Sequence, residues 1–258
     1  MVNYMKSEWY RIWHTKEVYI TTGVLAGLAF LMNLVLFISN RKIENFQYGT
    51  VSFSLSFLIS GMMVLLVAGM GMAFTLFSGE LRNGILKNAI ANGISREKIF
   101  LGKCVIAAVT ATFSLVVVLG VYIGSAVLLL DNGIVDESVQ IVLKGVAGIF
   151  FMAIASLILT IAFNSYFERE IIAGLAWYVI IFVIPGICDL LGRKIALLKS
   201  IAEWMPYNYL GNEVVANMSG WECLWETPEG LAKCLISGVI GIVIFLFSGI
   251  VLCRKRDV

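Results

Sequence analysis

Charged side chains are missing from the middles of the long apolar stretches in this sequence. Lys144 and Asp189 fall inside two of these stretches, but near their ends. Six stretches reach the roughly 20 residues that a helix needs to cross a bilayer; they lie at 18–38, 54–78, 104–130, 139–163, 171–191 and 233–253. Ion-coupled transporters and intramembrane proteases place ionisable groups at membrane depth. Their absence here argues against both classes.

Groups that bind metals or nucleotides are also scarce. His14 is the only histidine, and no pair of cysteines has C-x-x-C spacing, so we expect no metal site. A disulfide among Cys188, Cys223 and Cys234 is geometrically conceivable. The favoured interpretation is that these cysteines are small apolar side chains that fill space between helices. No G-x-x-x-x-G-K-[ST] phosphate loop occurs, so the chain is not expected to hydrolyse ATP by that route or to be an enzyme.

Apolar residues dominate what is present. They make up 60% of the 258 residues, charged residues make up 14%, and the mean hydropathy is +0.92. Soluble proteins are closer to half apolar and a quarter charged. The composition predicts an all-α integral membrane protein with six transmembrane helices in a single domain, 1–258.

The N-terminal residues 4–17 predict an amphipathic helix that lies in the headgroup region. Trp9, Ile12 and Trp13 share one helical face, opposite lysine and arginine side chains, and tryptophan favours the membrane boundary. The apolar stretch that follows has full span length and no small-residue cleavage pattern, so no cleavable signal is expected. A frayed polar lead-in to the first span is the alternative.

A charged segment, 79–103, separates the second and third apolar stretches. Its apolar residues from Leu81 to Ile90 fall on one helical face, which predicts a short amphipathic helix. Asn92-Gly93 is a helix stop, and Ser95 is positioned to cap the next helix. Such a helix between two spans is suited to contact a partner outside the membrane.

Basic residues predict the orientation. Placing both termini in the cytoplasm puts 12 of the 19 lysine and arginine residues on that side, including Arg254-Lys255-Arg256, and 7 on the other. Cytoplasmic segments of membrane proteins carry this excess.

Two further segments have a distinctive composition. The outer segment, 192–232, is rich in tryptophan, tyrosine and glutamate, which favours interfacial or re-entrant helices that cap the outer end. The second span contains four methionines that suit a pliable wall along a substrate path, or a flexible packing seam between helices: Met62, Met63, Met70 and Met72.

Six spans, the amphipathic N-terminal helix and the motif in 79–103 resemble the permeases of type-2 ATP-binding-cassette (ABC) transporters. Among these, the sequence is most similar to bacterial subunits that export peptides or confer lantibiotic immunity. The resemblance implies a type-2 ABC exporter fold in the bacterial cell membrane and a coupling helix that docks on a separate ATPase. The motif residues and neighbouring charges assigned to this docking are Glu80, Arg82, Gly84, Lys87, Asn88, Gly93 and Arg96.

The resemblance also implies the partners. Two permease subunits, identical or paralogous, pair with two cytoplasmic ATPases, which bind ATP and Mg²⁺; this chain itself needs no cofactor and binds no nucleic acid. The apolar, methionine-containing second span favours an amphipathic or hydrophobic peptide as cargo. The alternatives are an exporter of lipophilic drugs and a non-transporting membrane sensor or scaffold that binds a cytoplasmic partner.

Overall fold

The computed structural model describes most of the chain, and every structural statement below concerns these residues. Side chains are described except at 2–3, 78–82, 135–136, 215–217, 220–221 and 255. The described backbone covers 2–44, 46–82, 93–131, 135–167, 169–217 and 220–255.

The described chain is almost entirely helical, as the sequence predicts. The first half holds α1 (Val2–His14), α2 (Lys16–Lys42), α3 (Val51–Ser60), α4 (Val64–Arg82) and α6 (Arg96–Leu129). The second half holds α7 (Val135–Tyr166), α8 (Glu170–Tyr178), the π-helix η1 (Val179–Val183), α9 (Ile184–Gly192), α10 (Ala196–Ala202), α11 (Pro206–Asn212), the strands β1 (Val214–Asn217) and β2 (Gly220–Cys223), the 3-10 turn η2 (Leu224–Glu226) and α12 (Pro228–Lys255).

Five helical segments are long and apolar enough to cross a membrane, and α3 with α4 forms a sixth, bent one. Most helices extend beyond the predicted apolar stretches, because helical hydrogen bonding continues past the hydrocarbon into the polar boundary. The N-terminal helix ends at His14 instead of residue 17, and Lys16 already belongs to α2. The predicted connection 79–103 is shorter than expected, since α4 continues to Arg82 and α6 begins at Arg96.

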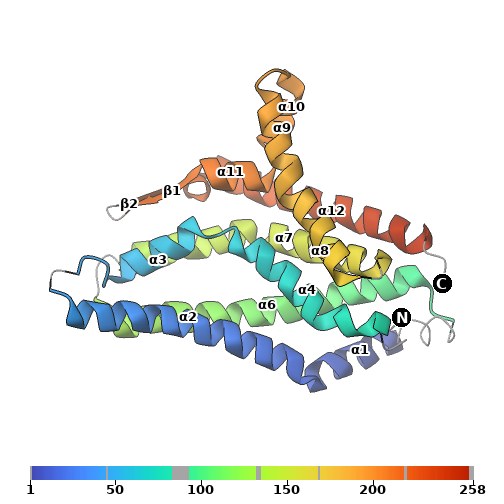
Figure 1. The fold of residues 1–258 in the computed structure, drawn as a ribbon, viewed down its shortest axis with the longest axis horizontal. Helices are drawn as coiled ribbons and strands as arrows, with labels where there is room; N and C mark the ends of the chain where they lie inside the picture. Colours follow the sequence, from blue (N-terminus) through green and yellow to red (C-terminus); the bar gives the residue numbers. More distant parts are fainter. Residues whose placement is uncertain are drawn as a thin grey trace.

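Helix α7 lies at the centre of the bundle. In its most apolar 18-residue window, 61% of the residues are buried, against 11% in α2 and in α12. The long helices α2, α6, α7 and α12 run along the long axis of the molecule, and both chain ends lie at the same end of it (Figure 1). The apolar side chains on the outside of α2 and α12 are suited to contact with lipid hydrocarbon. In a membrane they therefore do not need to be covered by other helices.

The predicted fifth span, 171–191, is one helical segment of changing pitch. Its middle, η1, is a π-helix turn that comes just before Pro185, which lacks a backbone N–H and interrupts regular helical bonding. The segment from α8 to α9 leaves the bundle at a steep angle, with α10 at its tip (Figure 1). Many of its large apolar side chains are exposed, including Leu175 and Leu190.

The outer segment contains the short helices α10 and α11, as the sequence suggests, and also a β-hairpin that was not predicted. In the hairpin, Val214 pairs with Cys223 in antiparallel register. Next to it, Trp225 is buried and donates from Nε1 to the carbonyl of Ile141 in α7 at 3.1 Å. The hairpin lies at the end of the bundle opposite the chain termini (Figure 1).

All five cysteines are free thiols. Cys223, at the end of β2, is buried, and this burial raises its pKa to about 12. Because the thiolate is the reactive form, Cys223 is inert at neutral pH.

Candidate functional site

The second predicted span, 54–78, is not one straight helix. The axes of α3 and α4 differ by 69° across residues 61–63. The hydroxyls of Ser56 and Ser60 donate to the carbonyls four residues earlier, a pattern that bends helices. The glycine that follows, Gly61, has low helix propensity. The serine spacing and this glycine together are the sequence signal for the bend.

A buried polar network holds the α3 half against α2 and α6. The Asn33 side-chain amide donates to the carbonyl of Tyr122 at 2.9 Å and to the Ser125 hydroxyl at 2.8 Å. The Ser54 hydroxyl donates to Oδ1 of Asn33 at 2.6 Å, and the Tyr122 hydroxyl donates to the carbonyl of Ser54 at 2.7 Å. Asn33 and Ser54 are fully buried. Polar side chains inside a membrane bundle hold helices together in this way.

A different set of contacts holds the α4 half against α7 and α8. The hydroxyl of Ser156 in α7 donates to the carbonyl of Leu66 at 2.7 Å, and accepts from Nε1 of Trp177 in α8 at 2.9 Å. Gly69 packs against the α7 backbone so closely that a Cβ atom there would lie 2.6 Å from the carbonyl oxygen of Ala153. The two halves therefore form their side-chain hydrogen bonds with different helices, while both also pack against α7.

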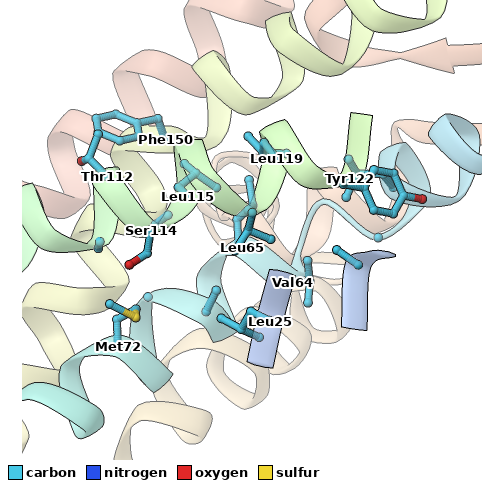
Figure 2. Close-up of a pocket in the computed structure, with 18 of the residues that line it drawn as sticks. Leu25, Val64, Leu65, Met72, Thr112, Ser114, Leu115, Leu119, Tyr122 and Phe150 are labelled. Carbon is cyan, nitrogen blue, oxygen red and sulfur yellow. The ribbon is translucent and has the colours of Figure 1, made fainter. Parts of the chain in front are cut away.

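A cavity of about 540 Å³ lies beside the bend, between α2, the two halves of the second span, α6 and α7. Figure 2 shows leucines, Val64, Met72 and the rings of Phe150 and Tyr122 around it. The lining residues are Leu25, Leu28, Ala29, Met32, Phe57, Leu58, Gly61, Val64, Leu65, Ala68, Gly69, Met72, Ala111, Thr112, Ser114, Leu115, Val118, Leu119, Tyr122, Phe150, Ala153, Ile154 and Leu157. Cavities of this size are typical of small-molecule sites.

The four methionines assigned to a substrate path lie in different surroundings, and their role in transport stays a prediction. Met72 lines the cavity, whereas Met62 is buried in the core around Val51 and Trp225. Met63 and Met70 are partly buried and pack against the same core. The second span does line the cavity, but mainly with Gly61, Leu65 and other aliphatic residues that the sequence analysis did not single out.

The end of the bundle that carries the termini also holds the segment between α4 and α6. Gly93 has a φ of +78°, a left-handed conformation that glycine adopts readily and that fits the predicted helix stop. Ser95 occupies the position just before α6, as predicted, but its side chain makes no capping hydrogen bond. At the second residue of α6, Glu97 Oε1 accepts from Nε of Arg254 at 2.6 Å, which joins the start of α6 to the end of α12.

Most of the residues predicted to dock an ATPase lie outside the described part of the chain. Gly84, Lys87 and Asn88 fall in the segment 83–92, and Glu80 and Arg82 belong to α4 but their side chains are not described. Gly93 and Arg96 are described, and they stand directly before α6 and at its first residue. Docking by all seven residues stays a prediction.

The N-terminal helix α1 divides its apolar residues between two environments. Ile12 is buried in a core shared with α6 and α12. Trp9 and Trp13 are more exposed, and their rings contact each other at 5.6 Å, with Trp13 also 5.4 Å from the ring of Phe113 in α6. The three residues predicted to share one apolar face thus point in two directions: the isoleucine points into the bundle and the tryptophans point outward. This arrangement is suited to a membrane boundary.

Comparison with known proteins identifies the family. No curated protein matches the chain significantly. The model of the ABC-2 family transporter proteins matches residues 4–186, which extend from α1 through the bent span, the segment between α4 and α6, and α7 into α9. This match covers more than half of the chain, so the protein belongs to the ABC-2 family of transporter proteins, as a multi-pass permease subunit of an ABC transporter.

Proposed function

We propose that this permease works with a separate cytoplasmic ABC ATPase, which binds ATP and Mg²⁺, and moves an amphipathic or hydrophobic peptide out of the cell or the membrane. The observation that carries the proposal is the family match over residues 4–186, because it includes both the bent span and the segment that follows it. The sequence contains no G-x-x-x-x-G-K-[ST] phosphate loop, so we assign ATP hydrolysis to the partner.

The proposed link to the ATPase runs through α4. This helix begins at the bend and ends at Arg82, directly before the segment 83–92 that contains Gly84, Lys87 and Asn88. A force applied at that segment is transmitted along a helix better than along a flexible loop. Since the hydrogen bonds of α4 run to α7 and α8 and those of α3 run to α2 and α6, a shift of α4 changes its position relative to α2 and α6. Packed helices respond to such shifts by changing between discrete arrangements.

The cargo proposal rests on the apolar composition of the spans. The middles of the six apolar stretches carry no charged side chain, and the second span consists mainly of glycine, methionine, serine and large aliphatic residues. Sugars and ions need polar or charged groups along their path. Lipophilic drugs share the chemistry of an apolar peptide face and are the second candidate cargo.

The proposed working unit has two permease subunits in a bacterial cell membrane, with both termini in the cytoplasm. The proposed contact is the segment from α8 to α9, which leaves the bundle of one chain at a steep angle (Figure 1) and carries exposed large apolar side chains. A second permease, either identical or paralogous, would cover its apolar side chains.

The test uses charge reversal in the coupling segment. We expect Glu80→Lys combined with Lys87→Glu to reduce co-purification of the partner ABC ATPase, and to reduce peptide-stimulated ATP hydrolysis, while membrane insertion is unchanged. Loss of charge-assisted contacts at an interface costs about 2–5 kcal/mol, which is enough to separate the subunits.

Arg169→Glu is the matched control, because Arg169 is an exposed basic residue at the start of α8, outside the coupling segment. Normal assembly and normal ATP hydrolysis in the double variant would contradict the docking assignment. Stable binding of an ATPase whose turnover never depends on the permease would instead favour the sensor or scaffold alternative. Stimulation of ATP hydrolysis by a sugar alone, with no response to peptides or drugs, would contradict the cargo proposal.

A further inference from the structure

The cavity beside the bend lies deep within the bundle. Its lining residues come from the middle of each long helix, such as Ala29 in α2, Leu115 in α6 and Ala153 in α7. In a bilayer, the middle of these helices lies at the level of the lipid acyl chains. The surroundings of the cavity are therefore hydrocarbon.

The cavity opens sideways, between α2 and the bent span. Leu28, Phe57 and Val64 line it and are also exposed on the outside of the bundle, at 58%, 56% and 53% respectively. These three side chains belong to α2, α3 and α4, so they form the rim of an opening that faces lipid. A molecule can enter from the bilayer without crossing a polar boundary.

The polar atoms in the wall are already satisfied. The Thr112 hydroxyl donates to the carbonyl of Ala108 at 2.7 Å, and the Ser114 hydroxyl pairs with that of Thr22 at 2.7 Å. The Tyr122 hydroxyl donates to Ser54, and Figure 2 shows it pointing away from the leucines. Water in a buried site needs two to four polar partners, and a peptide backbone must also have its hydrogen bonds satisfied. Neither finds free partners here, whereas a hydrocarbon chain needs none.

The volume argues against an empty cavity. The destabilisation caused by a void grows with its volume, because the lining atoms lose dispersion contacts. The cavity of about 540 Å³ is open on one side, so its lining atoms regain these contacts when a chain from the bilayer enters it. Acyl chains are present at the rim and fit the apolar wall.

We infer that this cavity is a binding site for one acyl chain of a bilayer lipid, which enters between α2 and α4 and fills the space beside the bend. The bound chain supports the bent form of the second span, because it occupies the space that α4 would need to approach α2 and α6. The site is independent of the proposed cargo and of the ATPase.

Photo-crosslinking tests the site. The permease, purified alone and placed in nanodiscs of phosphatidylethanolamine and phosphatidylglycerol, is irradiated with a trace of phospholipid that carries a diazirine near the middle of one acyl chain. We expect adducts on Leu65 and Met72, which line the cavity but are only 7% and 4% exposed, in addition to the lipid-facing residues. Adducts confined to outward residues such as Val67 would overturn the assignment.

A cavity-filling variant makes the test specific. Ala68→Phe places a ring in the cavity, so labelling of Leu65 and Met72 falls about tenfold, because the ring takes the space of several methylene groups. Val67→Phe is the matched control, since Val67 is the adjacent residue, is 40% exposed and does not line the cavity. Ala111→Phe on α6 serves the same purpose if Ala68→Phe does not fold.

Two results would overturn the inference. The first is unchanged labelling of Leu65 and Met72 in a folded cavity-filled variant. The second is displacement of the photolipid by a cationic amphipathic peptide at stoichiometric concentration, which would make the cavity a cargo site. Because no ATPase is present, neither result depends on whether the proposed ATPase docking is correct.

Discussion

Asn33 shows how a single polar residue organises this membrane bundle. Its amide lies in the middle of the apolar stretch 18–38, where an unpaired amide would be unfavourable, and all of its described partners come from other helices. The sequence marks Asn33 as an isolated polar residue, but its partners Ser54 and Tyr122 are 21 and 89 residues away. Their meeting depends on helix packing, which the pattern of one stretch does not determine.

Replacing Asn33 with alanine should destabilise the protein by about 1–3 kcal/mol, because it removes three hydrogen bonds between helices and leaves Ser54 and Ser125 without a partner amide. The midpoint of SDS-induced unfolding, followed by circular dichroism, measures the effect. Thr75→Ala is the control, since the Thr75 hydroxyl bonds only to Gly71 within its own helix. Equal midpoints for the two variants would contradict the role given to the network.

Asn164 presents the opposite case. Its side chain is buried near the end of α7, and neither its nitrogen nor its oxygen has a described hydrogen-bond partner. A buried polar group without a partner costs about 1–3 kcal/mol. Asn164→Leu should therefore raise the thermal unfolding temperature, whereas Asn164→Asp, which places a charge at the same position, should lower it. A leucine variant less stable than the original protein would show that the amide is satisfied in the membrane.

At the scale of the element, apolar periodicity was sufficient to place the spans but not their interruptions. The stretch 54–78 is predominantly apolar and contains no proline or charged residue, so it predicts one uninterrupted helix. The bend arises from serine hydroxyls bonded to their own helix and from Gly61, signals that are weak in isolation. Likewise, the aromatic-rich outer segment predicted helices, while its hairpin depends on pairing between residues such as Val214 and Cys223.

The contact between α4 and α7 predicts a sharp difference between two glycines on the same helix. Gly69→Ala should destabilise the protein by about 1–3 kcal/mol, since its Cβ would meet the carbonyl oxygen of Ala153 and push the two helices apart. Gly71→Ala should be neutral or slightly stabilising, because no atom lies within 4 Å of the added carbon and alanine favours helix. Thermal unfolding in detergent compares the two, and a Gly69→Ala variant as stable as Gly71→Ala would exclude the close contact.

At the scale of the whole molecule, α7 is the helix around which the others are arranged, and both halves of the bent span pack against it. The α3 half is bonded to α2 and α6, and the α4 half to α7 and α8. The end of α4 and the start of α6 lie at the same end as both termini (Figure 1). The N-terminal helix and the ion pair between Glu97 and Arg254 also lie there, at the end where we propose that the ATPase binds.

The orientation of this end can be tested by cysteine labelling. Six crossings place both termini on one side, and the excess of basic residues predicts that this side is the cytoplasm. Asn164, which the sequence alone places in a cytoplasmic turn, is unsuitable because it is buried in α7. Exposed positions at the two ends of the bundle are better: Glu44 and Glu222 at one end, Lys98 and Arg169 at the other.

Single cysteines at these four positions are introduced after the five native cysteines have been replaced. We expect Glu44→Cys and Glu222→Cys to react with a membrane-impermeant maleimide in intact cells, because both side chains are exposed at the end opposite the termini. Lys98→Cys and Arg169→Cys should react only after the membrane is permeabilised. Labelling of position 98 from outside would reverse the orientation, and the segment between α4 and α6 would then be unable to meet a cytoplasmic ATPase.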